Sequence, residues 1–360
     1  MSWTETSLDK VITFQRGFDL PKSKFKHGCY PVIGSTNILG YHDEYKVDPP
    51  CVTTGRSGTL GLFQYITEKS WPHNTSLWVK DFKDNEPKFI YYLLHTLNFS
   101  SLNVGSSVPT FNRNVIKSFY VKFPTSYQTQ KRIADILSDY DDLIENNLKR
   151  IKLLEQAAQN IYKEWFVNLR FPGHENTPIN EETGLPEGWE EDFIDNQLER
   201  VKRNGKLKKD DYLEVGDYPI IDQSDGFIGG YSNKEEIVQF EPLPLVIFGD
   251  HTRRVKYANF PFISGADGTQ LLSPLNKNML PAYFYLSIKS IDLSDYAYAR
   301  HFKYLKQQTI LIPDNETLKS FNDKVYPMLE QNLKLFTFNQ KLKAARDILL
   351  PRLMNRTIEV

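Results

Sequence analysis

The sequence repeats itself, and this duplication limits what the chain can fold into more than any other feature. Segments roughly 190 residues apart match in the same order along the chain. YPVI at Tyr30–Ile33 returns as YPII at Tyr218–Ile221, and VTTG at Val52–Gly55 returns as VIFG at Val246–Gly249. The remaining matches pair Trp3 with Trp189, Leu8–Asp9 with Ile194–Asp195, Ile12 with Leu198, Gly40–Tyr41 with Gly230–Tyr231, Tyr91–Leu93 with Phe284–Leu286, Phe123–Pro124 with Ile312–Pro313, and Glu145–Leu148 with Glu330–Leu333. Because the matched residues are mostly apolar or turn-forming, the repeat predicts two copies of one scaffold.

Each copy has the pattern of a mixed α and β domain. Short β-rich runs such as YPVIG, CVTTG, YPIID and LVIFGD are separated by Gly, Asn, Asp and Pro, as turns require. Short helices are predicted from Lys88 to Leu97 and from Pro281 to Ile288, with Pro87 and Pro281 at the helix starts. With 360 residues and 40% hydrophobic side chains, the chain is long enough for two packed cores. The predicted fold class is therefore α+β, with two mixed α/β domains.

Each half ends in a long helical pattern with a heptad stripe. From residue 128 to residue 165 core positions recur every three or four residues, as in a coiled coil. The positions are Ile133, Ile136, Tyr140, Ile144, Asn147, Ile151, Leu154, Ala158, Ile161 and Trp165, and in the second half Phe321, Val325, Met328, Asn332, Leu335, Asn339, Leu342 and Leu349, with Pro351 as the predicted helix end. A helix of about 37 residues extends about 55 Å and must find a partner. We expect an antiparallel two-helix coiled coil.

Three asparagines fall on these stripes. Asn147, Asn332 and Asn339 occupy predicted core positions, where a polar side chain lowers stability but can fix the register of the two helices. The alternative is that these asparagines lie at frayed positions or face the solvent.

Composition excludes several classes of protein. The net charge of −1 is inconsistent with a uniformly basic surface, although basic faces can still occur locally. Cys29 and Cys51 lack the spacing of a zinc site or a disulfide framework, so we expect two buried free thiols. The N-terminal MSWTETSLDK does not resemble a signal peptide and no run approaches the ~20 apolar residues of a membrane helix, which predicts a cytoplasmic protein.

Motifs of catalysis are missing from the sequence. Neither GxGxxG nor GxxxxGK[ST] occurs, so no phosphate-binding loop is indicated. Asp48-Pro49-Pro50-Cys51 approaches the [ND]PP[YFW] pattern of amino-methyltransferases, but Cys51 replaces the aromatic residue that would stack on a flipped base. We expect a turn before the strand CVTTG instead. Asp314 lacks a downstream ExK partner for a nuclease, so a helix N-cap is the favoured role.

Several strings, in this order and within a duplicated chain, resemble the specificity subunit of type I restriction-modification enzymes. They are TGRSGTLG at residues 54–61, WPHNTSLWV at 71–79, KEWFVNLRFPG at 163–173, LPEGWE at 185–190 and the tail DILLPRLMNRTIEV. The resemblance covers essentially the whole chain. One departure is that the first half has no LPEGW string and begins directly at SWTETSLDKV, which leaves the anchoring of its first strand open.

The resemblance implies two target-recognition domains in a pseudo-two-fold arrangement, each reading one half of a split, asymmetric site in double-stranded DNA. It implies that the helices act as a spacer and dock two methyltransferase subunits, with two restriction subunits completing the enzyme. S-adenosylmethionine, ATP and Mg²⁺ would belong to those partners, and this chain would bind no cofactor or metal and hold no catalytic residue. The expected segments are recognition domain 1 at 1–125, the central helix at 126–170, a linker at 171–185, recognition domain 2 at 186–314 and the C-terminal helix at 315–355.

DNA-reading candidates lie on loops that differ between the matched landmarks. Arg and Lys recognise guanine, Asn and Gln recognise adenine, and small polar groups bind phosphates. The candidates in the first domain are Asn37, Arg56, Ser57, His73, Asn74, Thr110, Asn112 and Arg113. Those in the second domain are Gln223, Ser224, His251, Thr252, Arg253, Arg254, Arg300, His301 and Lys303. For each of them, a hydrogen-bonded role within its own loop is the alternative.

Two basic stretches occupy equivalent places in the repeat. Lys22 and Lys24 in the first half, and Lys202 and Lys206 in the second, are predicted phosphate contacts, with a solvated loop as the alternative. Two rival functions stay open at this stage. One is a DNA methyltransferase, and the other is a scaffold or restriction inhibitor that keeps the fold without reading DNA.

Overall fold

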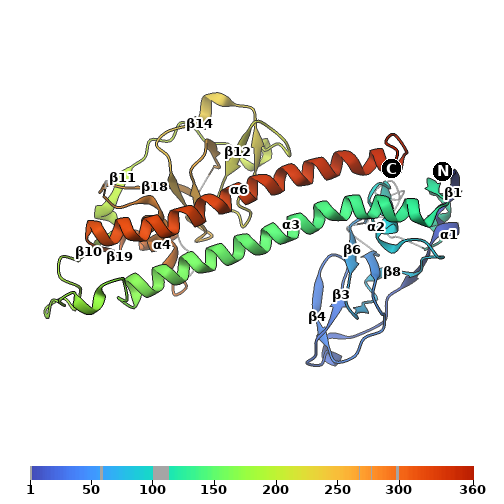
Figure 1. Cartoon of the computed structure of the whole chain (residues 1–360), viewed down its shortest axis with the longest axis horizontal. Helices are drawn as coiled ribbons and strands as arrows, with labels where there is room; N and C mark the ends of the chain where they lie inside the picture. Colours follow the sequence, from blue (N-terminus) through green and yellow to red (C-terminus); the bar gives the residue numbers. More distant parts are fainter. Residues whose placement is uncertain (1, 57–59, 100–112, 267, 277, 297–299) are drawn as a thin grey trace. The chain divides into compact units, whose positions relative to one another are not determined.

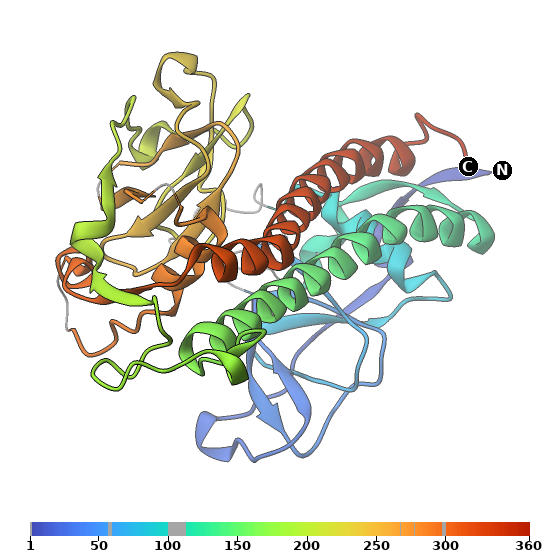
Figure 2. The same cartoon turned by 60° about the vertical axis from the view of Figure 1, so that its left-hand side comes forward.

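The computed structural model describes residues 2–56, 60–99, 113–266, 268–276, 278–296 and 300–360, and the side chains of residues 113–115 and 200 lie outside the description. The chain forms two compact units: the first comprises residues 1–148 and 336–360, and the second residues 149–335. Each of the two long helices contributes one segment to each unit (Figures 1 and 2).

The first unit contains three small sheets. An antiparallel pair joins β1 (Trp3–Ser7) to β9 (Tyr120–Pro124). A four-stranded sheet has the order β2 (Thr13–Arg16), β8 (Ser76–Asp81), β5 (Cys51–Gly55) and β6 (Phe63–Ile66), and a three-stranded sheet has the order β4 (Ile38–His42), β3 (Tyr30–Ile33) and β7 (Trp71–Pro72). The helical elements are α1 (Leu8–Val11), η1 (Lys22–Lys24), α2 (Pro87–His95) and η3 (Arg113–Ser118). Within this unit the three-stranded sheet lies farther from α3 than the four-stranded sheet does (Figure 1).

The second unit has a corresponding set of three sheets, with one additional strand, β14, in the sheet that contains the YPII strand. β10 (Glu190–Phe193) pairs with β19 (Thr309–Ile312). One four-stranded sheet has the order β11 (Leu198–Arg200), β18 (Thr269–Pro274), β15 (Leu245–Gly249) and β16 (Val255–Ala258), and the other has β13 (Gly230–Ser232), β12 (Tyr218–Ile221), β17 (Phe262–Ser264) and β14 (Val238–Gln239). The helical elements are η5 (His174–Asn176), η6 (Ile194–Gln197), η7 (Lys209–Asp211), η8 (Glu235–Ile237), α4 (Pro281–Ser290) and α5 (His301–Lys306).

Strand pairing confirms the duplication. The YPVI strand β3 runs parallel to β7, with Val32 opposite Trp71, and the YPII strand β12 runs parallel to β17, with Ile220 opposite Ile263. The VTTG and VIFG strands occupy equivalent places in the two other sheets. Helices α2 and α4 begin at the predicted prolines, Pro87 and Pro281.

The two long helices are α3 (Tyr127–Tyr162), continued by a π-helical turn at Lys163–Val167, and α6 (Asn315–Met354). Within the first unit they run antiparallel, since Asp141 contacts Arg346 and Asn147 contacts Asn339. In the second unit Phe321 of α6 packs against Tyr162 of α3. These contacts confirm the antiparallel helix pair.

Ten of the eighteen positions of the heptad stripes are buried as predicted, and the other eight are half-buried. Ile133 and Val325 have no exposed surface, and Ile144 keeps 7%, whereas Ile151 is only half-buried. Asn147 and Asn339 are buried and bonded to one another, but Asn332 is half-buried and its Oδ1 is buried without a partner.

The predicted end of the second helix at Pro351 is wrong. Helix α6 continues to Met354, so Pro351 lies in its last turn. A proline at this place removes one backbone N–H, but the helix continues past it, and the Asn355 N–H donates to the Pro351 carbonyl at 3.0 Å.

Asp314 has the predicted capping role. Its Oδ1 accepts the backbone N–H groups of Glu316 (2.9 Å) and Thr317 (2.8 Å) at the start of α6. Its Oδ2 accepts the Trp189 indole N–H at 2.9 Å, which ties β10 to the helix start within the second unit.

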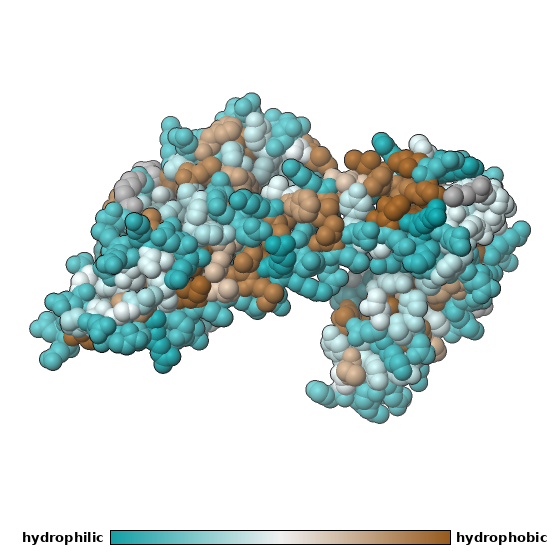
Figure 3. Space-filling view, viewed as in Figure 1, coloured by the Kyte–Doolittle hydropathy of each residue, from teal (hydrophilic) through white to brown (hydrophobic). Residues whose placement is uncertain are grey.

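The surface is largely hydrophilic in the view of Figure 3, and hydrophobic residues gather over the C-terminal end of α6. Among the described residues, no helix is long and apolar enough to cross a membrane. The described part of the chain also holds no group of three or more His, Cys, Asp or Glu side chains placed to bind a metal ion.

Candidate nucleic-acid interface

Three loops of the second unit join into one surface. The first follows β12 at residues 222–226, the second follows β15 at 250–254, and the third leads into α5 at residue 300. Gln223 links the first two loops: its Oε1 accepts the His251 N–H (3.1 Å), and its carbonyl accepts the Thr252 hydroxyl (2.6 Å). The predicted candidates Gln223, His251 and Thr252 are therefore brought together.

Asp250 fixes the third loop to the second. Its carbonyl accepts the backbone N–H of His301 at 2.9 Å, and its Oδ1 accepts the Phe302 N–H at 2.8 Å in the first turn of α5. Asp250 is 5% exposed and its own N–H donates to the Gly268 carbonyl. Sequence reasoning did not single out Asp250, because its partners are some fifty positions away in the chain.

Exposed cations lie on this three-loop surface. Arg253, Arg254, Arg300 and Lys303 are all exposed. Arg254 Nε donates to Asp225 Oδ1 at 2.6 Å, and Arg253 donates to the Leu293 carbonyl at 3.0 Å from a left-handed backbone position. Arg300 is the residue that precedes α5. Two guanidinium groups thus have an internal partner, while the surface remains rich in donors.

His301 is placed differently from its sequence interpretation. The side chain is 5% exposed, and its ring nitrogens lie 2.9 Å from the Asp250 carbonyl and 3.2 Å from the Tyr296 carbonyl. A ring held in this way cannot reach a base edge without breaking two contacts. His301 was predicted to contact DNA, but its ring instead holds the start of α5 to the Asp250 carbonyl. The prediction for its neighbour Arg300, which is exposed, is unaffected.

Lys256 is a buried cation that sequence reasoning also missed. It lies on β16, is 6% exposed, and donates from Nζ to the carbonyls of Asp222 (2.7 Å) and Gly226 (2.5 Å). Burial lowers the pKa of Lys256, and the Asp222 carboxylate, 3.7 Å away, opposes this shift. The signal in the sequence is the position of Lys256 between the apolar residues Val255 and Tyr257 of strand β16.

The first unit has a matching set of loops. After β3 the Gly34 N–H donates to the Asn37 carbonyl at 2.8 Å, forming a tight turn that leaves the Asn37 side chain exposed. Thr75 then joins two loops, because its carbonyl accepts the Ser35 hydroxyl (2.9 Å) and the Arg56 N–H (3.0 Å). Asn37 and half-buried Arg56 therefore belong to one loop cluster.

His73 and Asn74 are held by internal hydrogen bonds. The His73 ring nitrogens lie 2.9 Å from the Thr75 hydroxyl and 3.1 Å from the Leu20 carbonyl, and the Asn74 amide donates to Asp19. Both side chains stabilise the loop cluster, so the alternative stated for them, a hydrogen-bonded loop role, has direct geometric support.

The remaining candidates divide into two groups. Ser57, Thr110 and Asn112 lie outside the described residues, as does the side chain of Arg113. The four predicted phosphate contacts are exposed, with Lys22 and Lys24 on η1 and Lys202 and Lys206 on the loop after β11.

The DPPC string is a bend before β5, as expected, and Cys51 is fully buried in that strand. The expectation of two buried thiols is wrong for Cys29, which is exposed. Gly28 packs so closely that a Cβ there would lie 2.1 Å from the His42 carbonyl oxygen. Cys29 lies in the bend before β3, where its side chain faces the solvent.

Comparisons with known proteins agree with this architecture. The family model described as the type I restriction modification DNA specificity domain matches residues 2–156 and 186–343. The chain is 26% identical over 300 residues to the type I restriction enzyme MjaIX specificity subunit of Methanocaldococcus jannaschii, covering 74% of this chain and 68% of the relative. It is 21% identical to a putative type I specificity subunit of Mycoplasma genitalium, covering 81% and 76%. The crystal structure of a type I restriction-modification S subunit from M. genitalium has the same fold, with a TM-score of 0.66 at 16% identity over 98% of this chain and 96% of that one.

Proposed function

The chain belongs to the family of type I restriction-modification DNA specificity subunits, and we propose that each of its two domains reads one half of a split, asymmetric DNA site. A member of this family is the non-enzymatic component that directs the other subunits of its enzyme to DNA.

The observation that carries the proposal is one scaffold with two different loop clusters. Equivalent loops follow the YPVI and YPII strands and the VTTG and VIFG strands. In the first unit they hold Asn37 and Arg56, and in the second they hold Gln223, His251 and the nearby Arg300. Two reading surfaces of different chemistry predict two different half-sites.

Each loop cluster combines groups suited to bases with groups suited to phosphates. Asn37 and Gln223 have the amide that recognises adenine, and Arg56 and Arg300 have the guanidinium that recognises guanine. Ser224, Thr252, Arg253, Arg254 and Lys303 add contacts in the second domain, while Lys22, Lys24, Lys202 and Lys206 neutralise phosphates. Ser57, Thr110, Asn112 and Arg113 are further DNA contacts of the first domain under this proposal.

The long helices act as the spacer in this scheme. Helices α3 and α6 set the number of unspecified base pairs between the half-sites and dock two methyltransferase subunits, with two restriction subunits completing the enzyme. S-adenosylmethionine, ATP and Mg²⁺ then belong to the partners. The buried Asn147–Asn339 pair supports the scheme because a polar pair in a coiled coil fixes its register.

Mapping of N6-methyladenine in cells that express the enzyme with this chain tests the proposal. The wild-type chain should direct methylation to a bipartite motif, and Arg300→Ala should relax one half of that motif, since a good base contact discriminates by about 1–3 kcal/mol. Lys234→Ala, an exposed change before η8 in the same unit as Arg300, is the matched control. A methylation pattern that Arg300→Ala and Asn37→Ala both leave unchanged would favour the rival scaffold function, and stoichiometric S-adenosylmethionine binding by the isolated chain would revive a methyltransferase.

A further inference from the structure

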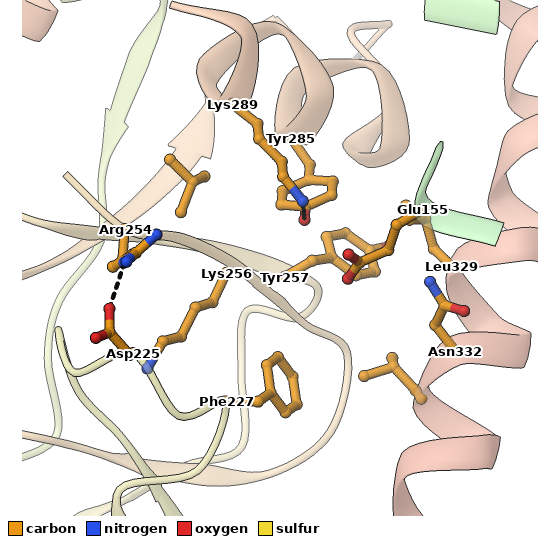
Figure 4. A pocket seen from close by; sticks show the side chains of 12 residues that line it. Glu155, Asp225, Phe227, Arg254, Lys256, Tyr257, Tyr285, Lys289, Leu329 and Asn332 are labelled. Atoms are coloured by element: carbon orange, nitrogen blue, oxygen red, sulfur yellow. Dashed lines mark hydrogen bonds and ion pairs between the residues drawn. The ribbon is translucent and has the colours of Figure 1, made fainter. Parts of the chain in front are cut away.

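The side chain of Lys256 closes the loop that carries Gln223 and Ser224. The two carbonyls that it binds, those of Asp222 and Gly226, stand at the two ends of this loop. With Asp222 Oδ1 at 3.7 Å, the three N–H donors of the ammonium group face three oxygens of one loop. Figure 4 shows the Lys256 side chain running toward the loop that bears Asp225, beside the Arg254–Asp225 ion pair.

The first unit has the same contact with a different residue. Thr53 of β5 lies opposite Gln64 of β6, just as Ile247 of β15 lies opposite Lys256 of β16. Gln64 is therefore the repeat equivalent of Lys256. Its Nε2 donates to the Gly34 carbonyl at 3.3 Å, and Gly34 follows YPVI as Asp222 follows YPII.

We propose that the side chain at this strand position, Gln64 in one domain and Lys256 in the other, is a positioning residue that holds the recognition loop after the YPVI or YPII strand. The inference rests on the proposed function, because it assigns these loops a part in reading DNA. It names a second layer of specificity residues that do not touch DNA themselves.

The two domains need different side chains because their loops differ in charge. The loop of the second domain contains the Asp222 carboxylate, which is nearly buried and also accepts the Ser224 N–H at 2.9 Å. A buried carboxylate is costly unless a cation is near, and Lys256 supplies that cation. The loop of the first domain has Gly34 at the equivalent place, so a neutral amide donor is sufficient there.

The contacts of Lys256 with the carbonyls of Asp222 and Gly226, called the clamp below, act on the DNA-reading side chains through the backbone of the loop. Gln223 lies between the two clamped carbonyls, and its contacts with His251 and Thr252 pass the constraint to the loop after β15. Loss of the clamp should free the loop at 222–226 and loosen the loop at 250–254, to which the start of α5 is tied through Asp250. The change in recognition should therefore be confined to the half-site that the second domain reads.

The test compares Lys256→Met, Lys256→Gln and Gln64→Met in the enzyme assembled with its other subunits. Lys256→Met keeps the length of the side chain but removes its donors, and Lys256→Gln introduces the donor that the first domain uses. Amide hydrogen exchange at Ser224 and His251 measures loop order, and methyladenine mapping measures the preference at each half-site. We expect Lys256→Met to accelerate exchange at these amides about tenfold or more, which corresponds to about 1.4 kcal/mol, and to relax one half-site only.

Lys256→Gln should recover part of both effects, and Gln64→Met should relax the other half-site. The proposal is overturned if Lys256→Met accelerates exchange while both half-sites keep their preference, or if Lys256→Met relaxes both half-sites equally. If the enzyme with Lys256→Met does not assemble, Lys256→Gln is the deciding variant. Amide exchange and half-site preference equal to wild type in Lys256→Gln would contradict the need for a charged side chain at this position. A wild-type enzyme with no bipartite preference would refute the proposed function, while the exchange data would still show whether the clamp exists.

Discussion

The side chain of Asn147 donates to Asn339 Oδ1 at 2.8 Å, and both asparagines are only 4% exposed in the helix pair of the first unit. Asn339 also donates from Nδ2 to the Ile144 carbonyl at 3.2 Å. Asn339 therefore accepts from Asn147 through its amide oxygen and donates to the backbone of α3 through its amide nitrogen. A partner left alone in this place would lose its hydrogen bond without regaining water.

Replacing one asparagine should lower the free energy of unfolding more than replacing both. Asn147→Leu leaves the Asn339 carbonyl buried without a donor, and we expect a loss of about 1–3 kcal/mol in the free energy of unfolding. The double variant Asn147→Leu, Asn339→Leu should be near wild type or more stable, because both polar groups are gone. Urea denaturation of the four proteins in a double-mutant cycle measures this, and additive losses would contradict the pairing.

The scaffold could be predicted from the sequence because its signals are periodic or local. The repeat predicted two domains of the same topology, the heptad stripes predicted α3 and α6, and Pro87 and Pro281 marked two helix starts. The capping role of Asp314 could be predicted because the two backbone N–H groups that it caps lie two and three residues after it, although its contact with Trp189 could not. The predicted features themselves depend on no distant contact.

The details of the candidate interface depend on distant contacts, and the sequence does not show them. Lys256 follows the exposed residues Arg253 and Arg254 in the string RRVK, yet the pairing of β16 with β15 turns it inward. His301 is buried because the Asp250 carbonyl, from another loop, binds its ring. This tertiary contact buries His301, while its neighbour Arg300 faces the solvent.

The two cysteines should differ sharply in reactivity. Cys29 is exposed, whereas Cys51 is fully buried and its burial raises the pKa of the thiol to about 12. At pH 8 the folded protein should therefore expose one reactive thiol to Ellman's reagent and the denatured protein two. In Cys29→Ser the fast reaction should vanish, and a fast-reacting thiol in that variant would show that Cys51 is accessible.

The raised pKa of Cys51 also predicts how the free energy of unfolding changes at alkaline pH. The folded state keeps the Cys51 proton between the ordinary pKa of 9.0 and about 12, while the unfolded state loses it. The unfolded state then binds fewer protons, so this group makes the free energy of unfolding fall as pH rises above 9. Cys51→Ala should reduce the loss of stability between pH 9 and 10.5 in urea titrations, with Cys29→Ser as the control that leaves the slope unchanged.

The cap at the start of α6 should contribute measurably to stability. Asp314→Ala removes the acceptor for two backbone N–H groups and for the Trp189 indole, and we expect a loss of about 0.5–2 kcal/mol. Asp314→Asn keeps an N-cap acceptor and should lose less. Thermal unfolding of the three proteins ranks them, and equal losses for alanine and asparagine would argue against capping.

Half-buried and exposed ion pairs of the first unit should respond differently to substitution. Asp141 Oδ1 accepts from Arg346 at 2.5 Å and its Oδ2 accepts the Tyr92 hydroxyl at 2.5 Å, with the Arg346 and Asp141 side chains 28% and 30% exposed. Asp141→Asn removes the charge from this junction and should cost about 1.5–3 kcal/mol, because each donor loses a charged acceptor. The Lys131–Asp135 pair on the same helix is 57% exposed on both sides, so Asp135→Asn should leave the unfolding midpoint unchanged. Urea midpoints of the two variants compare the pairs directly, and equal midpoints would mean that the junction around Asp141 contributes no more than a surface ion pair.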